Sequence, residues 1–401
     1  MTLKKNTTAI LLMLLFAAAI LSCSTAQNTP KVKNVIYLIG DGMGFGAVSG
    51  ALLCEDSITG FEMSPVIGLS ETCSANNLVT DSPAGGTALA CGERTLNGYL
   101  GVNVNGVPLE SILKKAQKMG KKSGIVVNTV LTEATPASFY AGVLSRSQSY
   151  DIAKQFVLSN VDVAVGAGLD VFINRPDSLD LTAALIEKGY DVYLNWKSVL
   201  ETQSQKFVGI LPMDNVHRRN KTVKQAGAAN GDEVCIAARM AALAEENKDG
   251  QPAFKEPEVY LEKAVSKALE VLSGIGKKDG FFLMIESAII DGYGHNNDSE
   301  GMKIEMAEFN RTLKVLVDYV RRTPQTLLVV VADHETGGTT VGYKPHKVGE
   351  KPNVELAFST KGHSGMVVPV FAYGAGADYF GGVLKNYEIP RIMERLMKNS
   401  R

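Results

Sequence analysis

The sequence predicts an α/β fold, a three-layer sandwich in which helices flank a central, mostly parallel β-sheet. Short runs rich in β-branched residues alternate with longer helix-like stretches, and the short runs are apolar at every position. Strands of this kind are buried on both faces, as in parallel sheets covered by helices. The clearest strands are predicted at 34–39, 125–127, 161–165, 281–285, 327–331 and 367–371, and the clearest helices at 260–272 and 302–320.

The composition is that of an ordinary globular protein. The 401 residues include 41 Lys+Arg and 42 Asp+Glu, and 45% of them are hydrophobic, which excludes a disordered, collagen-like or coiled-coil chain. A net charge of -1 argues against a nucleic-acid partner, because proteins that bind the phosphate backbone usually carry a strongly basic face. No repeat or low-complexity linker divides the chain. We therefore expect one domain over 34–401, with an insertion around 215–256.

The N-terminal segment has the features of an export signal. Lys4 and Lys5 precede an apolar stretch at 9–21, which is shorter than the roughly 20 residues needed to span a bilayer. Ser22-Cys23 resembles a bacterial lipoprotein cleavage site, so we expect removal of 1–22, lipidation of Cys23 and a tether over 23–33. The alternative is an ordinary secretory signal cut a few residues later. Both predict an exported protein of the periplasm or cell envelope, and in the lipoprotein case it meets the membrane only through its N-terminal lipid.

Four further cysteines are spaced neither like a small disulfide scaffold nor like a structural zinc site. They are Cys54, Cys73, Cys91 and Cys235. We interpret them mainly as buried small apolar residues, with Cys54 and Cys73 as the candidate pair for a bridge.

Polar residues that follow the predicted strands are candidates for a binding site, because ligands of open α/β sheets bind beyond the carboxyl ends of the strands. The first strand runs into GDGMG at 40–44. Asp41, flanked by glycines, can be approached from several sides, which suits a carboxylate that bridges two cations. The alternative for this segment alone is an Asp that only forms a turn.

Two other strands end in residues that bind metals. The run at 281–285 leads to Glu286, Asp291 and His295, and a helical turn would place the last two on one face. The run at 327–331 leads to Asp333 and His334, which offer the mixture of oxygen and imidazole ligands that suits zinc.

The histidines support the same region. Of the five in the chain, His295, His334 and His363 lie in acid- or glycine-flanked segments next to predicted strands. His217 and His346 stand among Arg, Lys and Pro residues, and we interpret them as solvated surface residues.

A candidate nucleophile occurs in TDSPAGGTALA at 80–90. Pro83 suits the first position of a helix, so Ser82 would lie at a helix N-terminus, where the dipole favours an anionic phosphate and an alkoxide. On local sequence alone, an N-cap role for Ser82 is favoured over a catalytic one.

In combination, these segments resemble the alkaline phosphatase family, in the family's order and over nearly all of the chain after the signal segment. The matching segments are GDGMG at 40–44, TDS at 80–82, EATPA at 133–137, SR at 145–146, Glu286 through Asp291 to His295, DHETGG at 333–338, and GHSG at 362–365. The resemblance implies an exported phosphomonoester hydrolase of broad substrate range that acts through a phosphoserine on Ser82 and releases inorganic phosphate. It also implies a homodimer, although no interface can be identified in the sequence.

The resemblance implies three metal sites as well. Their ligands would be Asp291, His295 and His363 for one zinc; Asp41, Asp333, His334 and the Ser82 oxygen for a second zinc; and Asp41, Thr135 and Glu286 for a third ion, usually magnesium. Imidazole ligation fits zinc, and oxygen-only ligation fits a hard cation. Arg146 matches the guanidinium that grips the phosphate.

Two positions depart from the family pattern. Glu133 stands where bacterial members often have Asp and vertebrate members His, and we expect its longer carboxylate to reach the third ion directly. Gly292 stands where bacterial members often have Lys. The loss of that cation predicts weaker phosphate binding and faster product release.

Three alternatives stay open at this point. A sulfatase needs x-Pro-x-Arg after the nucleophile, whereas SPAGG at 82–86 has Pro one place early and no Arg. Phosphodiesterases of the superfamily usually have Thr as nucleophile and lack the phosphate-gripping Arg, so Ser82 with Arg146 favours monoesters. The non-enzymatic alternative is an exported lipoprotein that binds metal or phosphate without turnover.

Overall fold

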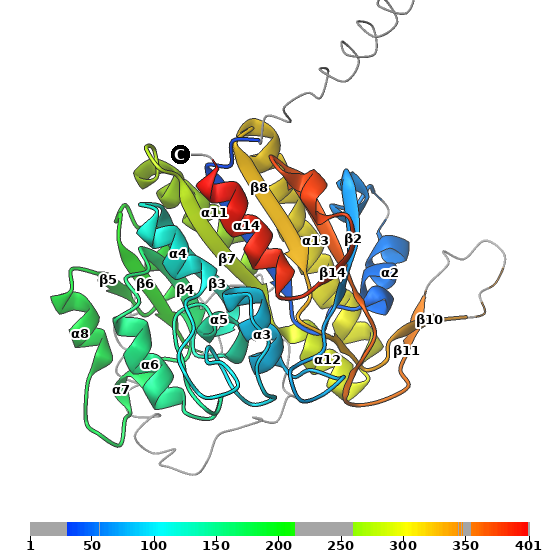
Figure 1. Ribbon diagram of the computed structural model, residues 1–401, viewed down its shortest axis with the longest axis horizontal. Coiled ribbons are helices and arrows are strands. Elements are labelled where there is room, and N and C mark those ends of the chain that lie inside the picture. The colour runs from blue at the N-terminus through cyan, green and yellow to red at the C-terminus, as the bar shows by residue number, and fades with distance from the viewer. Residues whose placement is uncertain are drawn as a thin grey trace, which may run out of the picture.

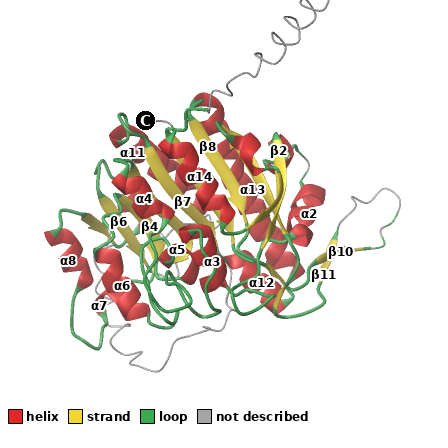
Figure 2. Cartoon of the chain, viewed as in Figure 1, coloured by secondary structure: helices red, strands yellow, loops and turns green. Residues whose placement is uncertain are grey.

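A ten-stranded sheet forms the centre of the protein, and all neighbouring strands in it are parallel except the two pairs that include β13 (Figures 1 and 2). The computed structural model describes residues 30–55, 57–212, 260–343, 345, 347 and 354–399. The predicted signal segment, Cys23, Cys235, His217, His346 and the insertion around 215–256 lie outside these residues. In sheet order the strands are β14 (Gly382–Lys385), β2 (Val66–Glu71), β13 (Val368–Gly374), β8 (Thr326–Val331), β1 (Asn34–Gly40), β7 (Phe281–Ser287), β3 (Lys122–Val130), β4 (Val163–Ala167), β6 (Phe207–Leu211) and β5 (Asp191–Tyr193).

The apolar runs of the sequence form the middle of this sheet. Every residue of β7 and of β8 is buried, and so is every residue of β1 after Asn34. Each of the six predicted runs falls on one of these strands, and the predicted fold class is confirmed. The edge strands β5 and β14 are short and partly exposed, and their sequences carry no comparable apolar signal.

Helices cover both faces of the sheet. The long helix α13 packs against α2 and α11 on one face, whereas α14 packs against α4 and α3 on the other (Figure 1). The helices are α2 (Phe45–Cys54), α3 (Ser82–Cys91), α4 (Ile112–Lys118), α5 (Ala134–Ala137), α6 (Ser149–Val157), α7 (Asp170–Ile173), α8 (Leu181–Glu187), α9 (Trp196–Glu201), α11 (Tyr260–Ile275), α12 (Ile289–Asn296), α13 (Ser299–Arg322) and α14 (Glu388–Lys398), with short 3₁₀ turns η1 (Phe61–Met63) and η4 (Ala377–Phe380).

The sequence of α13 shows why it forms a long helix. Asp298 caps its N-terminus by accepting a hydrogen bond from the Gly301 backbone N–H, and two arginines lie in its last turn, where they interact favourably with the dipole. The predicted helices at 260–272 and 302–320 correspond to α11 and α13.

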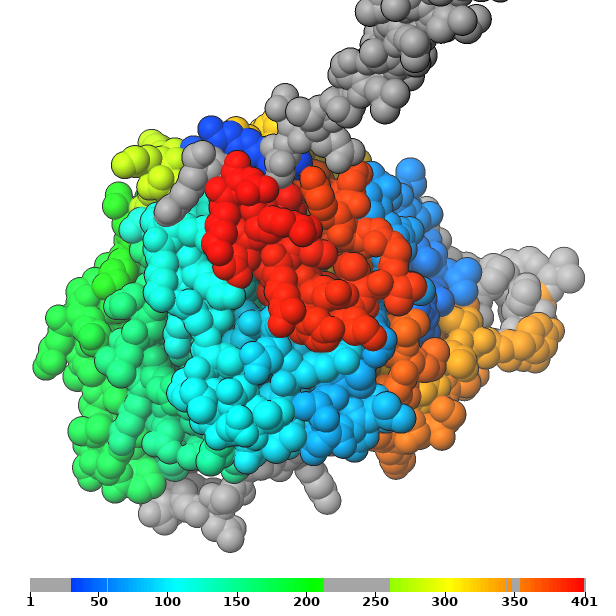
Figure 3. All heavy atoms as spheres, viewed as in Figure 1, coloured from blue at the N-terminus to red at the C-terminus, as the bar shows by residue number. Residues whose placement is uncertain are grey.

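The last helix, α14, packs against α4, which lies far from it in the sequence. In the space-filling view α14 lies directly against the segment that contains α4 (Figure 3). Lys115 of α4 and Glu394 of α14 form an ion pair at 2.7 Å across this contact.

Two further strand pairs stand outside the main sheet. They are β10 (Thr340–Gly342) with β11 (Glu355–Ala357), and β9 (Glu335–Thr336) with β12 (His363–Ser364). The pairing of His363 with Thr336 brings two distant motifs of the sequence together.

The interpretation of the cysteines needs correction. Cys73 is a free thiol that donates to Glu71 Oε1 at 3.3 Å, so no bridge joins it to Cys54. Cys54 is exposed, and Cys73 and Cys91 are partly buried, so the expectation of buried apolar cysteines is wrong for Cys54. The exposure of Cys54 follows from its position at the end of α2, where the helix leaves the core.

Among the described residues, no helix combines the length and the apolar character that crossing a membrane requires.

Candidate active site

Four adjacent strands deliver most of the candidate residues to one edge of the sheet. The four neighbouring strands are β8, β1, β7 and β3. Asp333 and His334 follow β8, and Asp41 follows β1. Glu286 lies near the end of β7, and Thr135 lies in α5, which follows β3. Register keeps them level, because Ile39 pairs with Glu286 on one side and with Val331 on the other.

The reversed direction of β13 explains how His363 joins this group. His363 precedes β13 in the chain, whereas the other candidates follow parallel strands. Because β13 is antiparallel to β8, its beginning lies at the edge where the parallel strands end. His363, which precedes β13 in the chain, therefore lies beside residues that follow the parallel strands.

Asp291, His295 and His363 form what we call the first cluster. The predicted helical turn is α12, and it brings His295 Nε2 to 3.3 Å from Asp291 Oδ2. His363 Nε2 lies 3.2 Å from His295 Nε2 and 3.5 Å from Asp291 Oδ1. Three potential ligand groups thus lie next to one another, and His334 of the neighbouring cluster also approaches Asp291 and His363.

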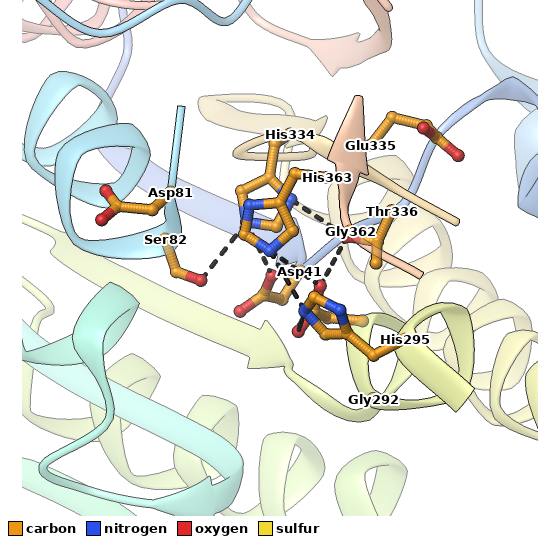
Figure 4. A network of polar contacts seen from close by, with 12 residues as sticks. Asp41, Asp81, Ser82, Gly292, His295, His334, Glu335, Thr336, Gly362 and His363 are labelled. Carbon is orange, nitrogen blue, oxygen red and sulfur yellow. Dashed lines mark hydrogen bonds and ion pairs between the residues drawn. The ribbon is translucent and has the colours of Figure 1, made fainter. Parts of the chain in front are cut away.

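Asp41, Asp333 and His334 form the second cluster. His334 Nε2 lies 3.4 Å from Asp41 Oδ1 and 3.3 Å from Asp333 Oδ2, and all three residues are buried. The rings of His334 and His363 stack with centroids 3.6 Å apart, so the two clusters adjoin (Figure 4).

The Ser82 hydroxyl points into the second cluster. Its Oγ lies 3.2 Å from His334 Nε2, and the residue is buried (Figure 4). The local expectation that Ser82 caps the helix is wrong, because Asp81 is the N-cap of α3. The Asp81 carboxylate points away from the clusters and accepts from the backbone N–H groups of Ala84 at 3.0 Å and Gly98 at 2.6 Å. Asp81 therefore leaves the serine hydroxyl available for chemistry.

Several buried oxygens at this edge have no hydrogen-bond donor among the described residues. They are Asp41 Oδ1, Thr135 Oγ1, both Glu286 Oε atoms and Asp333 Oδ2. Burial of unpaired polar oxygens is costly unless a cation or a donor compensates for the lost water. This set of carboxylate and hydroxyl oxygens therefore fits bound cations, with oxygen-only ligands around Glu286 and Thr135.

The proton affinities of the buried carboxyl groups reflect the same shortage of positive charge. Burial and the neighbouring Asp333 raise the pKa of Glu286 to about 8. Burial and the nearby Asp291 raise the pKa of Asp333 to about 7. Burial and Asp333 also hold the pKa of Asp41 well above its ordinary value. A cation at this point would favour the ionised forms of all three.

The first cluster is balanced internally. Burial acts to raise the pKa of Asp291, but hydrogen bonds from His295 and His363 outweigh it and hold that pKa well below its ordinary value. The same hydrogen bond raises the pKa of His295 to about 9. Burial and the adjacent His363 lower the pKa of His334 to about 3, so its ring is neutral and one nitrogen offers a lone pair.

Arg146 lies beside the site on the loop after α5. Its guanidinium forms an ion pair with Glu133 Oε1, and the Arg146 side chain is 43% exposed. The positive charge of Arg146 acts on the pKa of Asp41 and of Glu286, lowering both against the larger effect of burial. Glu133 also accepts from the Ala134 backbone N–H at 3.2 Å and so caps α5.

Comparison with known proteins identifies the family. The family model described as alkaline phosphatase matches residues 32–353, which is more than half of the chain. This chain belongs to the alkaline phosphatase family. It is therefore a phosphomonoesterase, and metal dependence and a phosphoserine intermediate are general features of its family.

Relatives and solved structures agree with the family model. The chain is 26% identical to alkaline phosphatase 4 of Bacillus subtilis over 94% of this chain and 91% of that protein. It is 31% identical to the alkaline phosphatase of Schizosaccharomyces pombe, over 79% of this chain and 58% of that protein. The alkaline phosphatase of the Antarctic bacterium TAB5 matches with a TM-score of 0.76 at 30% identity, over 93% of this chain and all of that one.

Some polar residues of this alkaline phosphatase site were not assigned roles from the sequence. Glu335 is fully buried and accepts from the Thr339 backbone N–H at 2.7 Å and from the Ser364 hydroxyl, next to His363. Thr336 contacts Asp291 and His334. Both lie within the DHETGG segment, but only the tertiary structure shows what their side chains contact.

The Arg146–Glu133 pair predicts an effect on phosphate binding. Glu133→Gln is expected to lower the inhibition constant of inorganic phosphate about 2- to 5-fold, because the carboxylate competes with phosphate for the guanidinium of a half-exposed pair. The amide oxygen of Gln can still cap α5. The measurement is phosphate inhibition of p-nitrophenyl phosphate hydrolysis, and an unchanged constant would contradict the competition. The separate expectation that Glu133 reaches the third ion would be contradicted by a metal-bound structure in which Glu133 makes no contact with that ion.

Proposed function

We propose that Ser82 is the nucleophile of this phosphatase and that the two clusters around it hold the metal ions. The observation that carries this proposal is the position of Ser82 Oγ, 3.2 Å from His334 Nε2 at the start of α3. A buried serine hydroxyl beside a group of acidic and imidazole ligands is suited to form a covalent phosphoryl intermediate.

We propose two zinc ions and one magnesium ion as the metals. The first cluster has two imidazoles and a carboxylate, and the second has one imidazole and two carboxylates. Both have the donor types that zinc prefers. Asp41, Thr135 and Glu286 offer only oxygen, which suits magnesium. Among similar solved structures, a TAB5 enzyme variant with histidine replaced by glutamate has Mg bound in its M3 site. When bound, such ions would lower the pKa of the serine hydroxyl and offset negative charge on the phosphoryl group.

The residues of the chain then account for the two halves of the reaction. Ser82 Oγ, once it has lost its proton, forms a bond to phosphorus while the bond from phosphorus to the leaving oxygen breaks. The alcohol departs and the phosphoryl group stays on Ser82. Water then cleaves the Oγ–P bond, releases inorganic phosphate and restores the hydroxyl. The N-terminus of α3 and the Arg146 guanidinium both favour the negative charge of the phosphoryl group.

The substrates we propose are phosphomonoesters of many alcohols. The residues described at the site would contact the phosphoryl group and not the leaving group, so esters of many alcohols should bind. The test is hydrolysis of p-nitrophenyl phosphate, bis-p-nitrophenyl phosphate and a sulfate ester by protein lacking residues 1–23, with metals measured by mass spectrometry. Zinc-dependent turnover of the monoester well above the other two is expected. Bound phosphate without turnover would instead support the binding protein, and faster diester cleavage a phosphodiesterase.

Gly292 allows a direct test of the missing cation near the phosphate. A Cβ atom added at this glycine meets no heavy atom within 4 Å, so a side chain can begin there without a clash. Gly292→Lys is expected to lower the inhibition constant of phosphate about 5-fold, as one water-mediated charge contact of ~1 kcal/mol would give, and to slow product release. Gly292→Gln is the neutral control of similar length. Equal constants for the Lys and Gln variants would show that charge at this position has no effect.

We also propose that the protein is exported and anchored through a lipid on Cys23. Support comes from the sequence alone: Lys4 and Lys5, the apolar stretch at 9–21, and Ser22 before the cysteine. Cys23→Ala is expected to move the protein from the membrane fraction to the soluble fraction of the envelope. Its continued presence in the membrane fraction would contradict the anchor. The homodimer implied by the family resemblance is a separate proposal, which light scattering of the soluble form tests.

A further inference from the structure

Thr336 lies between the two clusters and contacts a ligand group of each. The residue is fully buried in β9, and its hydroxyl donates to Asp291 Oδ1 of the first cluster at 2.5 Å. The same Oγ1 lies 3.2 Å from His334 Nδ1 of the second cluster. Figure 4 shows these contacts converging on the Thr336 side chain.

The number of protons on the hydroxyl fixes the direction of these two hydrogen bonds. A threonine hydroxyl has one proton, and an ionised carboxylate can only accept. The proton therefore goes to Asp291, and Thr336 Oγ1 must accept from His334 Nδ1–H. In that tautomer His334 Nε2 carries a lone pair, and this nitrogen is the one that faces Asp41, Asp333 and Ser82.

The other two histidines have the same orientation but different partners. His295 Nδ1 lies 2.6 Å from the Lys361 carbonyl oxygen, and His363 Nδ1 lies 2.9 Å from the Thr80 carbonyl oxygen. Backbone carbonyls hold those rings with Nε2 directed inward, as is usual for histidines that bind metals. His334 differs because a side chain holds it, and that side chain also binds the other cluster.

Packing keeps the Thr336 side chain in this position. A Cβ atom at Gly42 would lie 2.8 Å from Thr336 Oγ1, and one at Gly294 would lie 2.9 Å from Thr336 Cγ2. Two glycines, one after β1 and one in α12, thus leave the space that the threonine fills. The hydroxyl has little freedom to turn toward other partners.

We propose that Thr336 is a positioning residue that couples the two metal clusters through its hydroxyl. The proposal rests on the proposed function in one respect, the binding of zinc at both clusters. Its consequence is that orientation of Asp291 in one cluster and of the His334 ring in the other depend on a single group. Loss of the hydroxyl should therefore weaken zinc at both sites together.

The test measures zinc affinity of metal-free protein by competition with a chromophoric chelator. Thr336→Val keeps the shape but removes the hydroxyl, and it is expected to weaken both zinc sites about 10- to 100-fold. Thr336→Ser restores the hydroxyl and is expected to bind within about 3-fold of the unmodified protein. The matched control is Thr312→Val, because Thr312 is fully buried in α13 and its Oγ1 has no hydrogen-bond partner in the described structure. That control should bind zinc normally.

Other outcomes would overturn the coupling. One such outcome is a folded Thr336→Val variant that binds both zinc ions as tightly as the unmodified protein does. Another is weaker binding at one zinc site only. Equal weakening in the Val and Ser variants would show that packing, and not the hydroxyl, is responsible.

A second measurement uses the unmodified protein, so it does not depend on the folding of any variant. Nitrogen chemical shifts of labelled histidine in the metal-free protein are expected to show His334 protonated on Nδ1, and protonation on Nε2 alone would contradict the proposal. Zinc affinity is measured without substrate, so absence of turnover in the unmodified protein would contradict the proposed function and leave this test intact. Failure of the unmodified protein to bind zinc would overturn both.

Discussion

Replacing Ser82 by alanine is expected to lower turnover of p-nitrophenyl phosphate by about 10³-fold or more, which corresponds to about 4 kcal/mol of the activation barrier. The reason is that Ser82 supplies the hydroxyl that meets His334 Nε2, at 3.2 Å, where the covalent bond to phosphorus would form. Asp81, and not Ser82, caps α3, so the substitution removes no capping hydrogen bond. Stability should therefore change little, and the loss should appear in kcat.

Three measurements distinguish a lost nucleophile from a damaged site. Zinc content and thermal unfolding of Ser82→Ala should match those of the unmodified protein. Acid quenching followed by mass spectrometry should find phosphate on the peptide that contains Ser82 in the unmodified protein only. Ser266→Ala is the control, since its hydroxyl bonds within α11 at 2.8 Å to Glu262. Retention of most activity by Ser82→Ala would show that the two-step scheme on this serine is wrong.

The central strands could be predicted because their burial leaves a direct mark on the sequence. A strand covered on both faces must be apolar at every position, as β7 and β8 are, and such runs are distinct from amphipathic helices. The edge strands β5 and β14 were missed because they are three and four residues long and partly exposed. The direction of β13 was also outside the reach of the pattern, since an apolar run does not record which way it crosses a sheet.

The candidate site could be located because parallel strands place their carboxyl ends together. Asp41, Asp333 and His334 each follow a buried run directly, and one rule about sheets is enough to group them. Their detailed roles are implied by the family resemblance and stay predictions.

The remaining features depend on contacts between distant segments. Asp81 and Ser82 are adjacent, and both can cap a helix. Asp81 does so by accepting from the Ala84 N–H, and its second carboxylate oxygen accepts from Gly98, which lies in a loop that the local pattern does not describe. Likewise, the Arg146 ion pair with Glu133 and the two hydrogen bonds of Thr336 join residues whose separation in the chain has no regular period. Such contacts become visible only when the fold is known.

Removal of the three proposed metals is expected to abolish activity and to lower the apparent melting temperature by roughly 10–25 °C. Each ion bound at 1,000 times its Kd stabilises the folded state by about 4 kcal/mol, and a chain of this length shifts by roughly 1–2 °C per kcal/mol. The buried oxygens of Asp41, Glu286 and Asp333, which lack hydrogen-bond donors in the described structure, would lose their compensating charge. The measurement is thermal unfolding with a chelator, followed by zinc and magnesium add-back.

The loss of stability should also depend on pH in a defined direction. The pKa values of Glu286 and Asp333, about 8 and about 7 in the folded chain, lie above their ordinary values of 4.5 and 3.8. The folded protein therefore holds these protons after the unfolded chain has released them, so stability falls as pH rises toward those values. His295, with a pKa raised from 6.5 to about 9, adds stability that is present below 6.5 and is lost as pH rises to 9. The lowered pKa values of Asp291 and His334 act below pH 6.5, where they oppose this trend.

Between pH 6.5 and about 9 the three shifts thus act in one direction, and the metal-free protein should lose stability steadily across this window. Bound cations favour the ionised carboxylates and the neutral imidazoles, so the metal-loaded protein should lose much less over the same range. The informative quantity is the difference in melting temperature between the two forms at each pH, because titrating groups elsewhere affect both equally. That difference should grow from pH 6.5 to pH 9. A constant difference would mean that the site carboxyl groups do not hold their protons in the metal-free fold, and that something other than a bound cation compensates the buried oxygens.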